Sequence, residues 1–154
     1  MAPLIILLSS FSLLWLVNNF LLGKRLSISF IGRLSLAIML LFTGAAHFFK
    51  TAVMVESMPD FLSYKVELVY LTGVLELLGA IGLLLPATAR ISAVALILFF
   101  IAILPANIIG SMKHVAFGGM ENGPVYLFFR IPLQAFFIGW AYYFGIRKFN
   151  RQGK

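Results

Sequence analysis

The chain has 154 residues, of which 62% are hydrophobic and 11% charged. Since about a quarter of the residues of a soluble domain are charged, this composition excludes an ordinary soluble domain and predicts an integral membrane protein. The net charge is +7, but the basic residues lie mainly beside apolar runs, where they set membrane orientation, so we expect no nucleic-acid partner. With no cysteine and only two histidines, the chain excludes thiolate-held clusters and covalent c-type haem, and we expect no metal site.

Five apolar runs predict five membrane-spanning helices and an all-α, polytopic helical bundle. The first run covers residues 3–22. No positive segment precedes it, no small-residue cleavage site follows it, and Lys24 and Arg25 come directly after it, so we interpret it as an uncleaved helix. The later runs cover residues 30–49, 66–85, 91–109 and 125–146.

The connecting segments differ in character. Residues 50–65 contain Pro59 and both signs of charge among apolar side chains, which favours a loop or a short helix in the membrane interface. Residues 110–124 are rich in glycine and proline and predict a loop. A basic tail follows residue 146.

The basic residues predict the orientation. One side of the membrane collects eight of the twelve, namely Lys24, Arg25, Arg33, Arg90, Arg147, Lys148, Arg151 and Lys154. The other side collects Lys50, Lys65, Lys113 and Arg130. By the positive-inside rule the C-terminus is cytoplasmic and the N-terminus is outside.

Glu76 is the acidic residue near the middle of an apolar run, the one at 66–85. A carboxylate at that depth costs about 2.5–3.5 kcal/mol on insertion scales, so it faces protein or water and needs a partner. Thr72, Gly73, Gly79 and Ala80 share its helical face, which allows another helix to approach closely.

Four more polar residues are expected near Glu76 in the outer half of the bundle. They are His47, Asn107, Arg130 and Gln134. Arg130 is the expected charged partner of Glu76. Pro105 and Pro132 each remove one backbone donor from a helix, so the freed carbonyl groups need other donors, and these helices can line a polar cavity.

Each of these residues has a structural alternative. Glu76 can fix helix register through an ion pair instead of binding a ligand, and Arg130 can extend to the interface. His47 can be an interfacial residue, and Asn107 and Gln134 can satisfy backbone carbonyls. The convergence of five polar residues indicates a site more strongly than any one of them.

Several stretches resemble the DoxX-like membrane proteins. They are LFTGAAHFF at 41–49, MPDFL at 58–62, YLTGVLELLGAIGLLLP at 70–86, ILPANI at 103–108 and FRIPLQ at 129–134. The resemblance implies a four-helix membrane bundle, to which this chain adds one N-terminal helix. The implied division is an N-terminal transmembrane helix at 1–23, a four-helix domain at 24–146 and a basic cytoplasmic tail at 147–154.

The resemblance also implies a range of functions. The family takes its name from a quinone-linked sulfur-oxidising system in which related chains are membrane subunits, and more distant relatives assist the assembly of other membrane proteins. We therefore expect a membrane subunit that binds a quinone, lipid or other amphiphile, with a soluble oxidoreductase as one partner and no catalysis by the chain alone. The alternative is a non-enzymatic assembly factor for other membrane proteins. A bacterial inner-membrane location accompanies both.

Overall fold

The computed structural model describes residues 2–148. Within these residues the secondary structure consists of helices joined by loops and turns, with no strand. Five helical segments are long and apolar enough to cross a membrane, so the chain is a multi-pass integral membrane protein in architecture. The predicted tail residues Arg151 and Lys154 lie outside the described residues.

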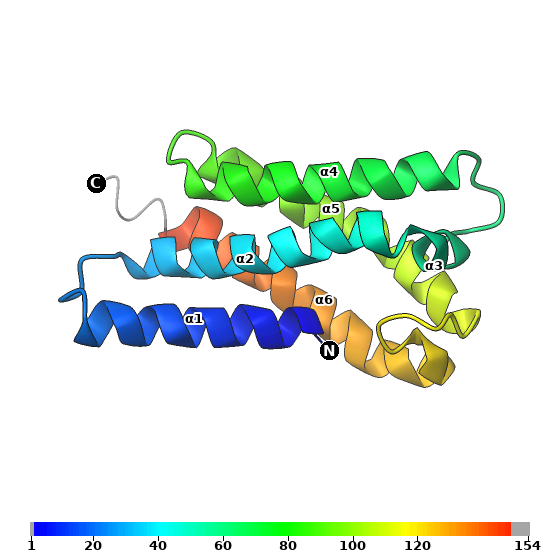
Figure 1. Ribbon diagram of the computed structural model, residues 1–154, viewed down its shortest axis with the longest axis horizontal. Helices are drawn as coiled ribbons and strands as arrows, with labels where there is room; N and C mark the ends of the chain where they lie inside the picture. The colour runs from blue at the N-terminus through cyan, green and yellow to red at the C-terminus, as the bar shows by residue number, and fades with distance from the viewer. Residues whose placement is uncertain (1, 149–154) are drawn as a thin grey trace.

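The helices run up and down along one long axis (Figure 1). The elements are α1 (Ala2–Phe20), α2 (Ile28–Phe49), the short α3 (Thr51–Glu56), α4 (Lys65–Leu84), α5 (Ala89–Met112), the 3₁₀ segment η1 (Met120–Tyr126), α6 (Leu127–Tyr142) and the π-helical turn η2 (Tyr143–Arg147). Each predicted span corresponds to one of the five long segments, and the expected short interfacial helix is α3.

Helix α2 is the central helix of the bundle. In the most apolar stretch of α2, 56% of the residues are buried inside the protein, against 11% in the corresponding stretch of α1. The helix that packs most extensively against α2 is α4. Two side-chain bonds join α2 to the C-terminal part of the chain: Ser29 Oγ donates to the Phe144 carbonyl at 2.8 Å, and Trp140 Nε1 donates to the Gly32 carbonyl at 2.9 Å.

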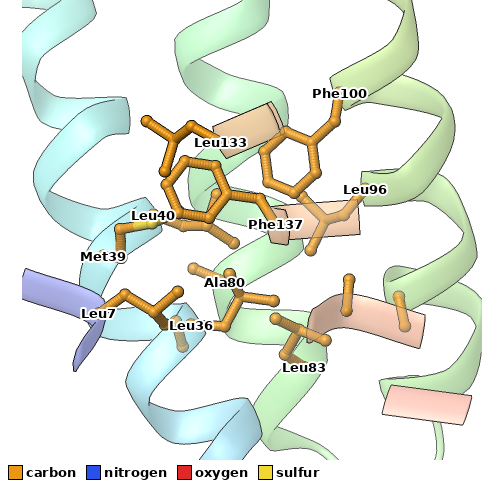
Figure 2. Close-up of a cluster of buried hydrophobic side chains, with 13 residues drawn as sticks. Leu7, Leu36, Met39, Leu40, Ala80, Leu83, Leu96, Phe100, Leu133 and Phe137 are labelled. Atoms are coloured by element: carbon orange, nitrogen blue, oxygen red, sulfur yellow. The ribbon is translucent and has the colours of Figure 1, made fainter. Parts of the chain in front are cut away.

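The apolar core lies where α2, α4, α5 and α6 meet (Figure 2). Leu40, Ala80, Leu96 and Phe137 contribute side chains from these four helices, and all are nearly inaccessible to solvent. Leu7 of α1 is also fully buried in this cluster. The N-terminal helix is therefore peripheral in most of its length, but it completes the core at one point.

Arg33 differs from the expectation that it is a charge at a helix end. It is only 5% exposed, and its Nη1 donates to the Leu83 carbonyl at 2.8 Å. Carbonyl groups in the last turn of a helix lack an intrahelical donor, and a cation there also interacts favourably with the helix dipole. Arg33 therefore joins α2 to the end of α4.

The opposite end of the bundle is closed by α3 and the segment from 113 to 126. Val115, Met120 and Tyr126 form a second apolar cluster, with Val53 of α3 packed against it. Gly123 interrupts η1 with φ +68°, and a Cβ there would also lie 2.3 Å from the His114 ring, so glycine is required on both counts.

An exposed ion pair joins the α3 side of this closure to α5. Lys113 Nζ donates to Asp60 Oδ1 at 2.6 Å and to the Met58 carbonyl at 3.1 Å, and Lys65 Nζ lies 3.5 Å from the same Asp60 oxygen. The hydrogen bond from Lys113 and its charge hold the pKa of Asp60 below its ordinary value. The stabilising contact is present above the ordinary Asp pKa and is lost as the pH falls through the lowered one.

Candidate functional site: a polar cavity at one end of the bundle

A cavity of about 440 Å³ lies beneath the closure formed by α3 and η1. It is called the polar cavity below. His47, Glu76, Asn107 and Arg130 line it, and they come from α2, α4, α5 and α6 respectively. Residues of α1, α3 and the segment from 113 to 126 complete the lining, among them Pro3, Met54 and Phe117.

One polar wall of the cavity is formed by α2 and α4. Glu76 is 4% exposed, and its Oε2 lies 3.9 Å from His47 Nδ1. That nitrogen is 2.9 Å from the Thr43 carbonyl, so the imidazole is oriented along its own helix. Thr43 lies within interaction distance of the Glu76 carboxyl group, yet Oε2 has no hydrogen-bond partner among the groups of residues 2–148.

The close approach of α2 and α4 allows this wall to form. A Cβ at Gly73 would lie 2.7 Å from the His47 Cβ, and one at Gly44 would lie 2.9 Å from Leu77 Cδ2. The small residues therefore bring the two backbones near enough for His47 and Glu76 to face each other, as the small face around Glu76 indicates.

A second polar wall is formed by α5 and α6. Arg130 Nη2 donates to Asn107 Oδ1 at 3.0 Å, and Asn107 Nδ2 donates to the Ile103 carbonyl at 3.2 Å. The second bond fixes the orientation of the amide, so that its oxygen faces the guanidinium group. Within the described part of the chain, Arg130 Nε has no hydrogen-bond partner.

The expected pairing of Glu76 with Arg130 is not what the structure shows. None of the three ion pairs formed within residues 2–148 joins Glu76 to Arg130, although the two groups interact electrostatically at longer range. Arg130 instead bonds to Asn107, because the two residues lie on adjacent helices at one level, whereas Glu76 projects from the other wall.

Gln134 differs from the other four predicted site residues. It is buried and its Nε2 donates to the Phe100 carbonyl at 2.6 Å, so it joins α6 to α5 below the cavity and does not line it. The sequence predicts that this amide bonds to a carbonyl freed by a proline, such as that of Ile101, four residues before Pro105. The observed acceptor is the carbonyl of Phe100, one residue earlier.

Most of the residues that line the cavity were not predicted from the sequence, and Met120 and Tyr126 are two of them. Met120 is 5% exposed and Tyr126 is 8% exposed, and both close the cavity from the η1 side. The i, i+4 spacing of Tyr126 and Arg130 was an available signal, since that spacing places both on one helical face. The irregular segment from 113 to 126 gave no signal for Met120.

Comparisons with known proteins identify one family. A family model described as "Domain of unknown function (DUF8561)" matches residues 36–145, which include His47, Glu76, Asn107 and Arg130 and leave out α1. The searches of curated proteins and of solved structures returned no match. Since the matched region covers most of the chain, the protein belongs to the DUF8561 family.

Proposed function

We propose that this protein binds an amphiphilic small molecule in the polar cavity, with the polar head against Glu76 and Arg130 and the tail along the apolar lining. The observation that carries the proposal is the Glu76 carboxyl group. It is 4% exposed, lines a cavity of about 440 Å³ and leaves one oxygen without a protein donor.

The free-energy cost of a buried, unpaired carboxylate oxygen favours a ligand over a purely structural role for Glu76. A buried polar atom without a partner costs about 1–3 kcal/mol, and more when it is charged. A structural glutamate would recover this cost through a direct bond to His47 or Arg130, and neither bond is present at hydrogen-bond distance. The cavity volume falls in the range of small-molecule sites, about 300–1,000 Å³.

The cellular setting is part of the same proposal. We infer a membrane subunit in the bacterial inner membrane, with its N-terminus outside, a DoxX-like four-helix unit and a soluble oxidoreductase or a membrane protein as partner. Support comes from the five spans, the distribution of basic residues and the motifs quoted above. A quinone is one candidate amphiphile, and redox chemistry would belong to the partner.

The test is to purify the full chain in mild detergent and identify what remains bound by solvent extraction and mass spectrometry. Wild-type protein should retain one amphiphile at near-stoichiometric amounts. Glu76→Gln should reduce its retention about tenfold, the effect of losing one charge-assisted hydrogen bond. Glu67→Gln is the matched control, since Glu67 is an exposed acid on the same helix and does not line the cavity.

Two results would contradict the proposal. Wild-type protein carrying no amphiphile above bulk lipid would show that the cavity is not a ligand site. Equal retention by Glu76→Gln and Glu67→Gln would show that Glu76 does not hold the head. A stoichiometric protein in the preparation, with no small molecule, would favour the assembly role.

A further inference from the structure

The Glu76 wall of the polar cavity needs a hydrogen-bond donor. The Thr43 carbonyl can only accept, so the 2.9 Å contact places a proton on His47 Nδ1 and directs it toward Thr43. The 3.9 Å separation of that nitrogen from Glu76 Oε2 is too long for a hydrogen bond. The group that satisfies Oε2 must therefore come from the cavity.

The Arg130 wall needs an acceptor. Arg130 Nη2 donates to Asn107, which is neutral, and none of the ion pairs formed within residues 2–148 includes Arg130. Lys50 also lines the cavity, is exposed and takes part in none of the ion pairs formed within residues 2–148. Two cations therefore line the cavity, Arg130 on the wall opposite Glu76 and Lys50 at the end of α2.

Building on the proposed function, we propose that the bound head group is zwitterionic and is that of an ethanolamine phospholipid. The primary ammonium group donates to Glu76, and the phosphate accepts from Arg130 and Lys50. A neutral head could satisfy single hydrogen bonds, but it would leave Glu76 and Arg130, which interact only at longer range, without a charged group in direct contact, which is costly in a partly desolvated site.

The position of the cavity favours a lipid as the source of this head group. The cavity lies at one end of the membrane-spanning helices, and its lining includes Lys50 and Met58, which follow the end of α2. The end of the bundle lies near the ordinary level of phospholipid heads, and a head that reaches Glu76 lies below that level, inside the polar cavity, with its acyl chains in the bilayer or along the apolar lining.

A lipid competition measures this specificity with the intact protein. Delipidated full-length protein in detergent is mixed with equal amounts of phosphatidylethanolamine, phosphatidylcholine, phosphatidylglycerol and a neutral quinone, and native mass spectrometry reports the bound species. Phosphatidylethanolamine should be retained about tenfold over phosphatidylcholine, whose quaternary ammonium group has no N–H to donate to Glu76. It should exceed phosphatidylglycerol, which has no amine, by a similar factor.

Two variants separate the two ends of the head group. Glu76→Gln should abolish the preference for phosphatidylethanolamine over phosphatidylcholine, and Arg130→Gln should weaken retention of all three phospholipids, whereas Glu67→Gln should behave as wild type. Equal wild-type retention of the three phospholipids, or retention of the quinone alone, would overturn the zwitterion proposal and leave amphiphile binding intact. Retention of none of the four would overturn both. The wild-type comparison decides the matter even where a variant fails to fold.

Discussion

At the scale of single residues, the polar cavity is organised by bonds that orient side chains before any ligand is present. Asn107 donates to the Ile103 carbonyl and accepts from Arg130, so it positions the guanidinium group. His47 is oriented in the same way by the Thr43 carbonyl. Prearranged side chains lose less conformational entropy on binding, so these bonds favour affinity.

The contact between Arg130 and Asn107 predicts an energetic coupling. Asn107→Leu removes the acceptor and strands an Arg130 donor, which should lower the free energy of unfolding in detergent by about 1–3 kcal/mol. The double variant Asn107→Leu/Arg130→Gln should lose less than the sum of the single losses, because neither change then strands the other group. Thermal or denaturant unfolding of the four proteins measures the coupling.

The control is the corresponding cycle for Glu76→Gln and Arg130→Gln. These side chains lie on separate walls without an ion pair, so their coupling should be the smaller of the two. A larger coupling between Glu76 and Arg130 than between Asn107 and Arg130 would restore the direct pair expected from the sequence.

Sequence reasoning located the buried acid but not the partner of Arg130. A carboxylate in the middle of an apolar run needs burial or a partner whatever the rotation of the helix, so Glu76 stands out in the sequence. The choice between Glu76 and Asn107 as the partner depends on the rotation and level of α4, α5 and α6. Those are set by packing across the whole core and leave no local pattern.

At the scale of elements, the contact between α2 and α4 determines the geometry of the Glu76 wall. The two helices approach most closely around Gly73, where an added methyl group would lie 2.7 Å from the His47 Cβ and 3.2 Å from the Gly44 carbonyl oxygen. Neither the His47 Cβ nor the Gly44 carbonyl can move without a shift of the α2 backbone, so the contact between α2 and α4 tolerates no larger side chain at Gly73.

Gly73→Ala should therefore destabilise the protein by about 1–3 kcal/mol, the usual cost of overpacking. It should also separate His47 from Glu76 and weaken ligand retention. Gly139→Ala is the matched control, since a Cβ at Gly139 meets nothing within 4 Å and alanine favours the helix. Unfolding in detergent compares the two variants, and equal stability of Gly73→Ala and wild type would contradict the close packing of α2 and α4.

Helix α1 shows the limit of dividing the chain into an N-terminal helix and a four-helix domain by sequence alone. None of the five predicted polar residues comes from residues 1–23, and the family match also begins after α1. Nevertheless Leu7 is fully buried with Leu36 and Leu40, and Pro3 lines the polar cavity. Mean hydropathy identifies a spanning helix but does not report which of its faces contacts protein, so these two contacts were not predictable.

At the scale of the whole molecule, the number of spans and their order follow from hydropathy. Each long apolar run became one continuous helical segment, the last of them composed of η1, α6 and η2, because the bilayer core has no water to satisfy backbone groups and a helix satisfies them internally. The irregular parts were less predictable. The 3₁₀ segment η1 and the π-helical turn η2 depend on close contacts with neighbouring helices, such as Phe144 against Gly32.

The two ends of a membrane-spanning bundle face opposite sides of the membrane. Single engineered cysteines can report which end faces which side. The chain has no cysteine, so one engineered thiol is the only target for a maleimide. Ala87 and Ala116 are both exposed alanines in loops, the first between α4 and α5 and the second between α5 and η1, at opposite ends of the bundle.

By the positive-inside rule, Ala116→Cys should react with a membrane-impermeant maleimide on intact bacterial cells, whereas Ala87→Cys should react only after permeabilisation. Gel shift of the labelled protein measures both. The reverse pattern would place the polar cavity at the cytoplasmic face, and labelling of both sites on intact cells would contradict a single orientation.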